Sequence, residues 1–176
     1  MKTHPLFLGV IAGLTAISAA VAADAPAKPE AQAEIIFSHP EKFTDVRDGY
    51  TSNERGRDGL LNQIRDYVVT RVAVLVPAGQ KLTVTFTNID LAGDFEPWRG
   101  SQGMDIRIVK EIYPPRMDLE FKLTAADGTV LKEGKRQLRD LVFMSKLTIN
   151  RDDPLKYDKA LLDDWLRGEF PASKSG

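Results

Sequence analysis

The chain contains no cysteine, and this absence excludes several kinds of chemistry at once. Without thiols there is no disulfide, no thiolate metal site, no cysteine nucleophile and no lipid anchor attached through cysteine. Histidine is almost as scarce, with only His4 and His39. We expect His4 to be removed with an N-terminal signal peptide. Serine-histidine-aspartate catalysis, histidine-rich zinc sites and haem ligation would then all depend on His39. Because Pro40 follows His39, we expect a turn residue rather than a catalytic one.

A clear excess of one charge is also missing, since 24 Lys and Arg residues stand against 25 Asp and Glu residues. Proteins that bind nucleic acid or acidic membrane surfaces usually carry a basic excess, so we expect neither as a partner. The sequence contains no phosphate-binding loop, dinucleotide fingerprint, nucleophile elbow or HExxH motif. It therefore predicts no cofactor, no metal site and no catalytic residue.

The longest apolar run is too short for a membrane span and has the form of a signal peptide. It covers residues 6–20, whereas a transmembrane helix needs about 20 apolar residues. Lys2 precedes the run, and an Ala-Val-Ala sequence ending at Ala22 provides a small-residue cleavage site. We expect cleavage after Ala22 and export of a soluble chain to the periplasm, with no stable membrane span left. A short N-terminal membrane anchor is the alternative.

Composition divides the rest of the chain into three parts. Residues 23–33 are rich in Ala and Pro and have no large apolar side chain, which is typical of a flexible leader. Residues 34–170 have the ordinary length of one domain, and residues 171–176 form a polar tail. With the signal peptide at residues 1–22, the sequence predicts one folded domain.

Apolar periodicity predicts the elements of this domain. Steps of three and four indicate amphipathic helices over residues 58–75 and after Asp153, which we expect to be an N-cap followed by Pro154 in the first turn. β-branched or alternating runs predict strands at residues 34–37, 81–87, 106–112, 116–123 and 129–138. This order predicts an α+β domain, with a mostly antiparallel sheet of about five strands and two amphipathic helices packed on one face.

The connection after the strand at residues 81–87 holds most of the candidate binding residues. Loops held by rigid strands often carry binding groups. The carboxylates do not have the spacing of the twelve-residue calcium loop, so a metal site is not predicted. A purely structural interpretation also fits, with Gly93 in a turn and with Leu91 and Trp98 at the edge of the core. The candidates are Asp90, Asp94, Glu96, Trp98 and Arg99, together with Arg116 from a Tyr-Pro-Pro-Arg segment.

Short segments along the whole domain carry a family resemblance. They are Phe37-Ser38-His39-Pro40-Glu41-Lys42-Phe43-Thr44-Asp45, Asp90-Leu91-Ala92-Gly93, Tyr113-Pro114-Pro115-Arg116, Tyr157-Asp158-Lys159 and Asp163-Asp164-Trp165. Over residues 35–170 the chain resembles the domain-of-unknown-function family 3016, exported proteins of Gram-negative bacteria. The resemblance implies a periplasmic location. It carries no activity, cofactor or catalytic residue.

Three hypotheses of function remain. The first is a non-catalytic periplasmic domain that binds an envelope protein or a small ligand through residues 90–99. The second is a hydrolase of an envelope polymer that uses two of the carboxylates at Asp90, Asp94, Glu96 and Asp105 as acid and base. The third is a structural or stress-related envelope factor, for which we expect no concave cavity beside this loop.

Overall fold

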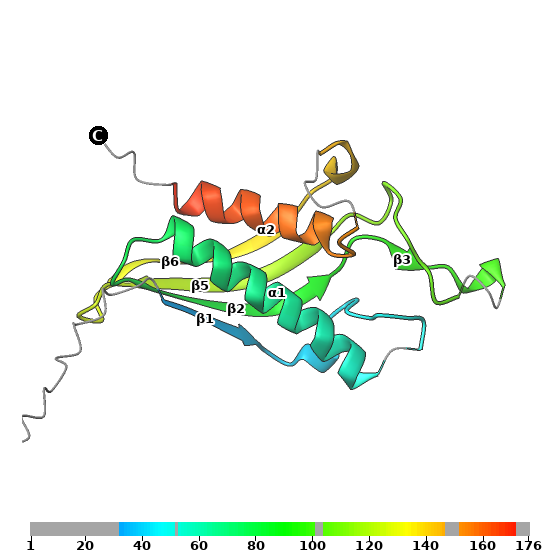
Figure 1. Cartoon of the computed structure of the whole chain (residues 1–176), viewed down its shortest axis with the longest axis horizontal. Helices are drawn as coiled ribbons and strands as arrows, with labels where there is room; N and C mark the ends of the chain where they lie inside the picture. Colours follow the sequence, from blue (N-terminus) through cyan, green and yellow to red (C-terminus); the bar gives the residue numbers. More distant parts are fainter. Residues whose placement is uncertain (1–31, 52, 101–103, 147–151, 172–176) are drawn as a thin grey trace, which may run out of the picture.

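The computed structural model describes residues 32–51, 53–100, 104–146 and 152–171, which form a four-stranded sheet with two helices over one face (Figure 1). The strands of this sheet are β1 (Gln32–Phe37), β2 (Lys81–Asp90), β5 (Arg116–Thr124) and β6 (Val130–Arg139). The helices are α1 (Glu54–Leu75) and α2 (Lys156–Glu169). A separate two-stranded ribbon pairs β3 (Asp94–Phe95) with β4 (Arg107–Ile108). The predicted α+β class is confirmed.

The sheet has the order β1-β2-β5-β6 and is mixed. β1 runs parallel to β2, and α1 supplies the crossover connection that a parallel pair needs. The β2-β5 and β5-β6 pairs are antiparallel. The predicted fifth strand at residues 106–112 is reduced to the two residues of β4, which pair with β3 outside the main sheet.

One apolar core lies between the sheet and the helices. Strict alternation along β2 and β5 directs every second side chain into this layer, and these side chains are 7% exposed or less. Each fully buried aliphatic or aromatic side chain contributes about 1.5–3 kcal/mol to stability. The core residues of the two strands are Leu82, Val84, Phe86, Met117, Leu119, Phe121 and Leu123, and the helices cover them with Leu61, Ile64, Val68, Val72, Leu161, Leu162, Trp165 and Leu166.

A β-bulge near the end of β2 changes the direction of the following side chains. The register between β2 and β5 shifts between Phe86 and Asn88, which leaves Thr87 as the extra residue. Before the bulge the even-numbered residues face the core, whereas after it Ile89 is buried and Asp90 is only partly buried. The bulge therefore directs Asp90 away from the apolar layer, as bulges beside functional sites commonly do.

The ends of several elements differ from the sequence expectations. β1 begins at Gln32, two residues before the predicted start of the domain. α1 begins at Glu54 rather than residue 58, because the Asn53 side chain accepts a hydrogen bond from the Gly56 amide at 3.1 Å and caps the helix. The predicted capping role of Asp153 is wrong: its carboxylate accepts from the Leu155 amide at 2.9 Å, and Leu155 is the N-cap of α2.

No helix within the described ranges is long and apolar enough to cross a membrane. The predicted signal peptide, residues 23–31 of the leader and residues 172–176 of the tail lie outside the described residues.

Candidate functional site

A cavity of about 250 Å³ lies where β2 ends and β5 begins. The two strands bring their chain ends together there, because Asp90 and Arg116 are cross-strand partners. The segment after β1 joins the same edge: Asp45 donates its amide to the Ile89 carbonyl and accepts from the Leu91 amide, both at 3.1 Å. The cavity is lined by Thr44, Asp45, Arg47, Asp90, Leu91, Gly93, Asp94, Ile112, Tyr113, Pro114 and Arg116.

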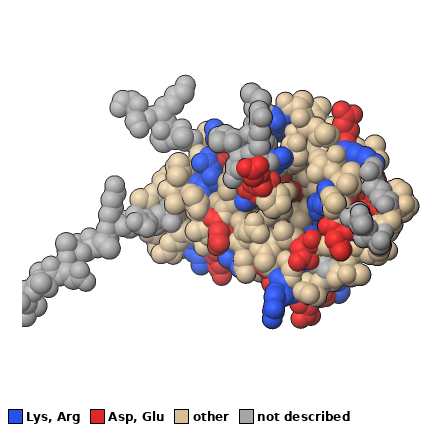
Figure 2. All heavy atoms as spheres, turned by 45° about the vertical axis from the view of Figure 1, so that its right-hand side comes forward, with Lys and Arg blue, Asp and Glu red and all other residues tan. Residues whose placement is uncertain are grey.

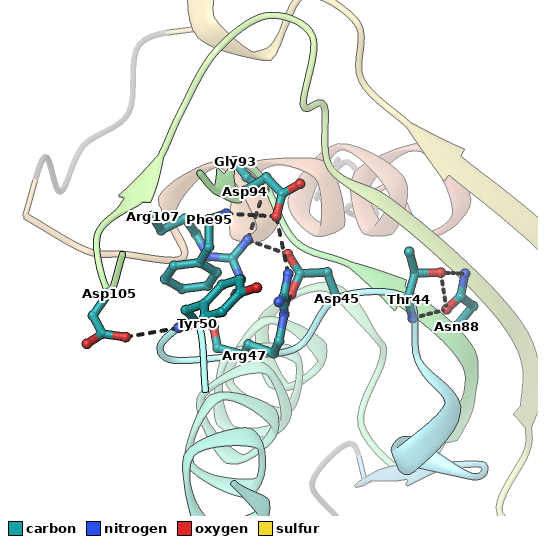
Figure 3. A network of polar contacts seen from close by, with 10 residues as sticks. All are labelled: Thr44, Asp45, Arg47, Tyr50, Asn88, Gly93, Asp94, Phe95, Asp105 and Arg107. Carbon is teal, nitrogen blue, oxygen red and sulfur yellow. Dashed lines mark hydrogen bonds and ion pairs between the residues drawn. The ribbon is translucent and has the colours of Figure 1, made fainter. Parts of the chain in front are cut away.

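One wall of the cavity is a closed network of ion pairs (Figure 3). Arg47 Nε donates to Asp45 Oδ1 at 2.8 Å, and an Arg107 terminal nitrogen donates to Asp45 Oδ2 at 2.9 Å. Arg47 also donates to Asp94 Oδ1 at 3.2 Å, and both guanidinium groups lie over the Phe95 ring. The hydrogen bond from Arg47 to Asp45 raises the pKa of Arg47. Because each oxygen of the buried Asp45 carboxylate has a guanidinium partner, Asp45 has a mainly structural role.

Gly93 also lines the cavity, and a larger residue at this position would require the neighbouring backbone to move. Its φ is +85°, and an added Cβ would lie 2.9 Å from the Ile108 carbonyl oxygen. The Gly93 amide donates to the Tyr113 carbonyl at 3.0 Å, and its own carbonyl accepts from Arg107 at 2.9 Å. The positive φ expected at Gly93 is confirmed, and the hydrogen bond to Tyr113 joins the loop after β2 to the segment before β5.

A second charged pair that lines the cavity, Asp90 and Arg116, is not closed by a hydrogen bond. The closest contact between Asp90 and Arg116 is 4.0 Å, whereas a charge-assisted hydrogen bond is about 2.7–2.9 Å long. The side chain of Asp90 is 24% exposed and that of Arg116 is 47% exposed. Burial raises the pKa of Asp90, with Arg116 acting against this and the negative charges of Asp45 and Asp94 adding to it. These two residues form an incomplete ion pair that a ligand can reach.

The structure brings three of the six candidate residues to the cavity, namely Asp90, Asp94 and Arg116. Glu96 instead lies in the interior, 1% exposed, where its carboxylate accepts from Lys110 and from the Tyr113 hydroxyl. Trp98 does not fill the core edge as expected, because its 73% exposed side chain lies on the surface. The position of the Arg99 side chain lies outside the described part of the chain.

Two further expectations concern carboxylates and metals. Asp105 is exposed, does not line the cavity, and accepts from the Tyr50 amide at 3.2 Å. Of the four carboxylates considered for hydrolysis, only Asp90 and Asp94 therefore line the cavity. Among the described residues, no group of three or more acidic or histidine side chains is arranged to hold a metal ion.

The candidates from the sequence did not include Asp158, a buried carboxyl group behind the cavity loop. Asp158 is completely buried in α2, and its Oδ1 accepts from the Ala92 amide at 3.0 Å. Its Oδ2 has no hydrogen-bond partner within the described ranges. Burial raises the pKa of Asp158 to about 7. A signal was available, because Asp158 lies three residues before Leu161, on the apolar stripe of the helix.

Surface charge around this end of the molecule is mixed. Figure 2, which brings the end with the cavity forward, shows acidic and basic side chains interspersed rather than gathered into a patch of one sign. A broad surface for a polyanion is therefore not visible on this face. The charged groups that a small molecule would meet at the cavity are the Asp90 carboxylate and the Arg116 guanidinium group.

Comparison with known proteins identifies a family. The model of a family described as "Protein of unknown function (DUF3016)" matches residues 31–168, which include every described helix and strand except the last residue of α2. The chain belongs to this family. No curated protein matches the chain.

Proposed function

Because membership in this family assigns no activity, we propose a function from the cavity: the protein is a non-catalytic binding domain of the bacterial cell envelope that takes a small charged ligand. The observation that carries this proposal is the incomplete ion pair between Asp90 and Arg116 in a cavity of about 250 Å³. This volume is just below the usual range for drug-sized ligands, about 300–1,000 Å³, so the ligand is small.

The envelope location rests on the N-terminal sequence, with cleavage after Ala22 and release into the periplasm. The experiment is expression of the full chain in a Gram-negative host, followed by fractionation and N-terminal sequencing. The expected result is a periplasmic protein that begins at Ala23. An uncleaved chain in the membrane fraction would favour the N-terminal anchor, and a chain that stays in the cytoplasm would contradict export.

A hydrolase is less well supported by the same geometry. Asp94 already accepts hydrogen bonds from Arg47 and from the Phe95 amide through Oδ1. Paired-carboxylate hydrolysis needs two carboxyl groups that move protons or attack the substrate, and Asp94 has only its second oxygen available for such a role. A structural factor without a ligand site is less well supported too, because a concave cavity does lie beside the loop.

A protein partner is the second candidate, favoured by a different observation. The segment between β3 and β4 exposes Trp98 and Ile106, at 73% and 56%. Large exposed aromatic side chains are enriched among the residues that dominate protein interfaces. Recovery of envelope proteins by the wild type and by Trp98→Ala tests this candidate, and equal recovery of every partner would remove Trp98 from it.

The test of ligand binding uses the low-mass fraction of a periplasmic extract. Amide resonances of Asp90, Asp94 and Arg116 are expected to shift in the wild type and to stay in place in Asp90→Asn. The matched control is Glu133→Gln, since Glu133 belongs to another cross-strand ion pair, 3.9 Å from Lys122, outside the cavity. No shift in the wild type would contradict the binding function. Chemical conversion of an extract component by the wild type, but not by Asp90→Asn, would establish catalysis instead.

A further inference from the structure

The cavity residues differ in how much of their hydrogen-bonding capacity is already used. Both oxygens of Asp45 accept from guanidinium groups, and Arg47 is shared between Asp45 and Asp94. Within the described part of the chain, Asp94 accepts through Oδ1, from Arg47 and from the Phe95 amide, while its side chain is 43% exposed. A ligand therefore finds free acceptors at Asp90 and at the second oxygen of Asp94.

The free donors of the cavity belong to Arg116. Arg116 has five N–H groups, and among the described residues its one ion pair is the contact with Asp90 at 4.0 Å. Its side chain is 47% exposed, so an anionic group can approach from solvent. A guanidinium group matches a carboxylate especially well, because two parallel N–H groups can donate to its two oxygens.

Charge and position together define the ligand. We propose that the cavity binds a small zwitterion that carries a primary ammonium and a carboxylate, such as a free amino acid or a short peptide. The ammonium donates to Asp90 and Asp94, and the carboxylate accepts from Arg116. This inference rests on the proposed binding function and names its ligand class.

The remaining surface of the cavity is consistent with a small body between the two charges. Leu91, Ile112 and Pro114 contribute apolar surface beside the charged groups. A cavity of about 250 Å³ holds roughly eight waters at about 30 Å³ each, which is the scale of an amino acid or a dipeptide. Ligands of polymer length would have to extend out of the cavity.

Three probes separate the contributions of the two charges. Glycylglycine carries both charges, glycylglycine ethyl ester carries only the ammonium, and N-acetylglycylglycine carries only the carboxylate. Binding is followed at millimolar concentrations by the amide shifts of cavity residues in the folded chain that begins at Ala23. Glycylglycine is expected to bind at least about tenfold more tightly than either blocked probe, because each blocked probe loses one charge-assisted hydrogen-bonded contact.

Variants assign each charge to a residue. Asp90→Asn is expected to weaken glycylglycine and the ethyl ester by about tenfold or more, and to leave the N-acetyl probe nearly unchanged. Arg116→Gln is expected to weaken glycylglycine and the N-acetyl probe and to spare the ester. The controls are Glu133→Gln and Lys122→Gln, which disrupt a comparable cross-strand pair at 3.9 Å and are expected to change none of the three affinities.

Two results would overturn the ligand class. One is an ethyl ester or N-acetyl probe that binds as tightly as glycylglycine, which would show recognition of a single charge. The other is the absence of any cavity shift with glycylglycine. If the periplasmic extract still shifts the cavity amides in that case, only the zwitterion proposal fails and the binding function stands. If neither the extract nor the probes shift them, both fail.

Discussion

The Asp158→Asn substitution should remove most of the pH dependence that the buried Asp158 carboxyl group gives to the free energy of unfolding. An aspartate in the unfolded chain titrates near its ordinary value of 3.8, whereas burial raises the pKa of Asp158 to about 7 in the folded protein. Between these values the folded state binds a proton that the unfolded state has released. Stability from this group is therefore fully present below pH 4 and is lost as the pH rises through 7.

The size of this effect follows from the difference between the pKa values of Asp158 in the folded and the unfolded chain. A gap of about 3 pKa units corresponds to about 4 kcal/mol over the full range, since one unit is about 1.4 kcal/mol. Between pH 5 and pH 8 the expected loss in the wild type is about 2–3 kcal/mol. The asparagine of the variant cannot ionise, but its side-chain oxygen can still accept from the Ala92 amide. The Asp158→Asn variant should gain about 2–3 kcal/mol relative to the wild type across this interval.

Urea unfolding at pH 5, 6, 7 and 8 measures this difference. The control is Asp164→Asn, on the same helix, whose side chain is 57% exposed and which should run nearly parallel to the wild type. The reasoning would be refuted if the curves of wild type and Asp158→Asn were also parallel from pH 5 to pH 8. Asp158 would then titrate at nearly the same pH in the folded and unfolded chains, and its burial would not control its ionisation.

Substitutions at three other positions test the framework of the site and one helix cap. Gly93→Ala should lower the free energy of unfolding by at least about 1–3 kcal/mol, because it combines a positive φ with an approach of 2.9 Å to the Ile108 carbonyl; a change below about 0.5 kcal/mol in urea unfolding would contradict this. Asp45→Ala should cost about 3–5 kcal/mol in the same assay, since it leaves two guanidinium groups without their shared acceptor, and Asp45→Asn should cost less. Asn53→Ala should cost about 1 kcal/mol by thermal unfolding through loss of the hydrogen bond from the Gly56 amide, and an unchanged melting temperature would argue against the cap.

The main elements could be predicted because their patterns are local. Alternation in β2 and β5 and the three- and four-residue steps in α1 and α2 follow directly from which side chains are buried. The parallel pairing of β1 with β2 has no such signature, since it depends on how α1 packs back over the sheet. β3 and β4 could not be predicted for another reason: strands of two residues are too short to show a period.

The candidate site could be predicted only in part, because its geometry depends on long-range register. Asp90 and Arg116 are 26 positions apart, and the β2-β5 pairing alone makes them neighbours. Sequence proximity suggested that Glu96 and Trp98 would join Asp94. The β3-β4 ribbon instead separates them, burying Glu96 against Lys110 and leaving Trp98 exposed. The network around Asp45 could not be predicted either, because isolated charged residues give no indication that they will share one buried cluster.

The β-bulge at Thr87 connects the fold to the proposed ligand site. In an unbroken strand the alternation that buries Val84 and Phe86 would also direct Asp90 into the core, where an isolated carboxylate is costly. The extra residue places Ile89 in the core instead and leaves Asp90 beside Arg116 at the cavity. The same register also keeps the pair apart at 4.0 Å rather than in a tight contact. A single irregularity in the most regular strand therefore produces both the exposure and the incomplete pairing on which the zwitterion site depends.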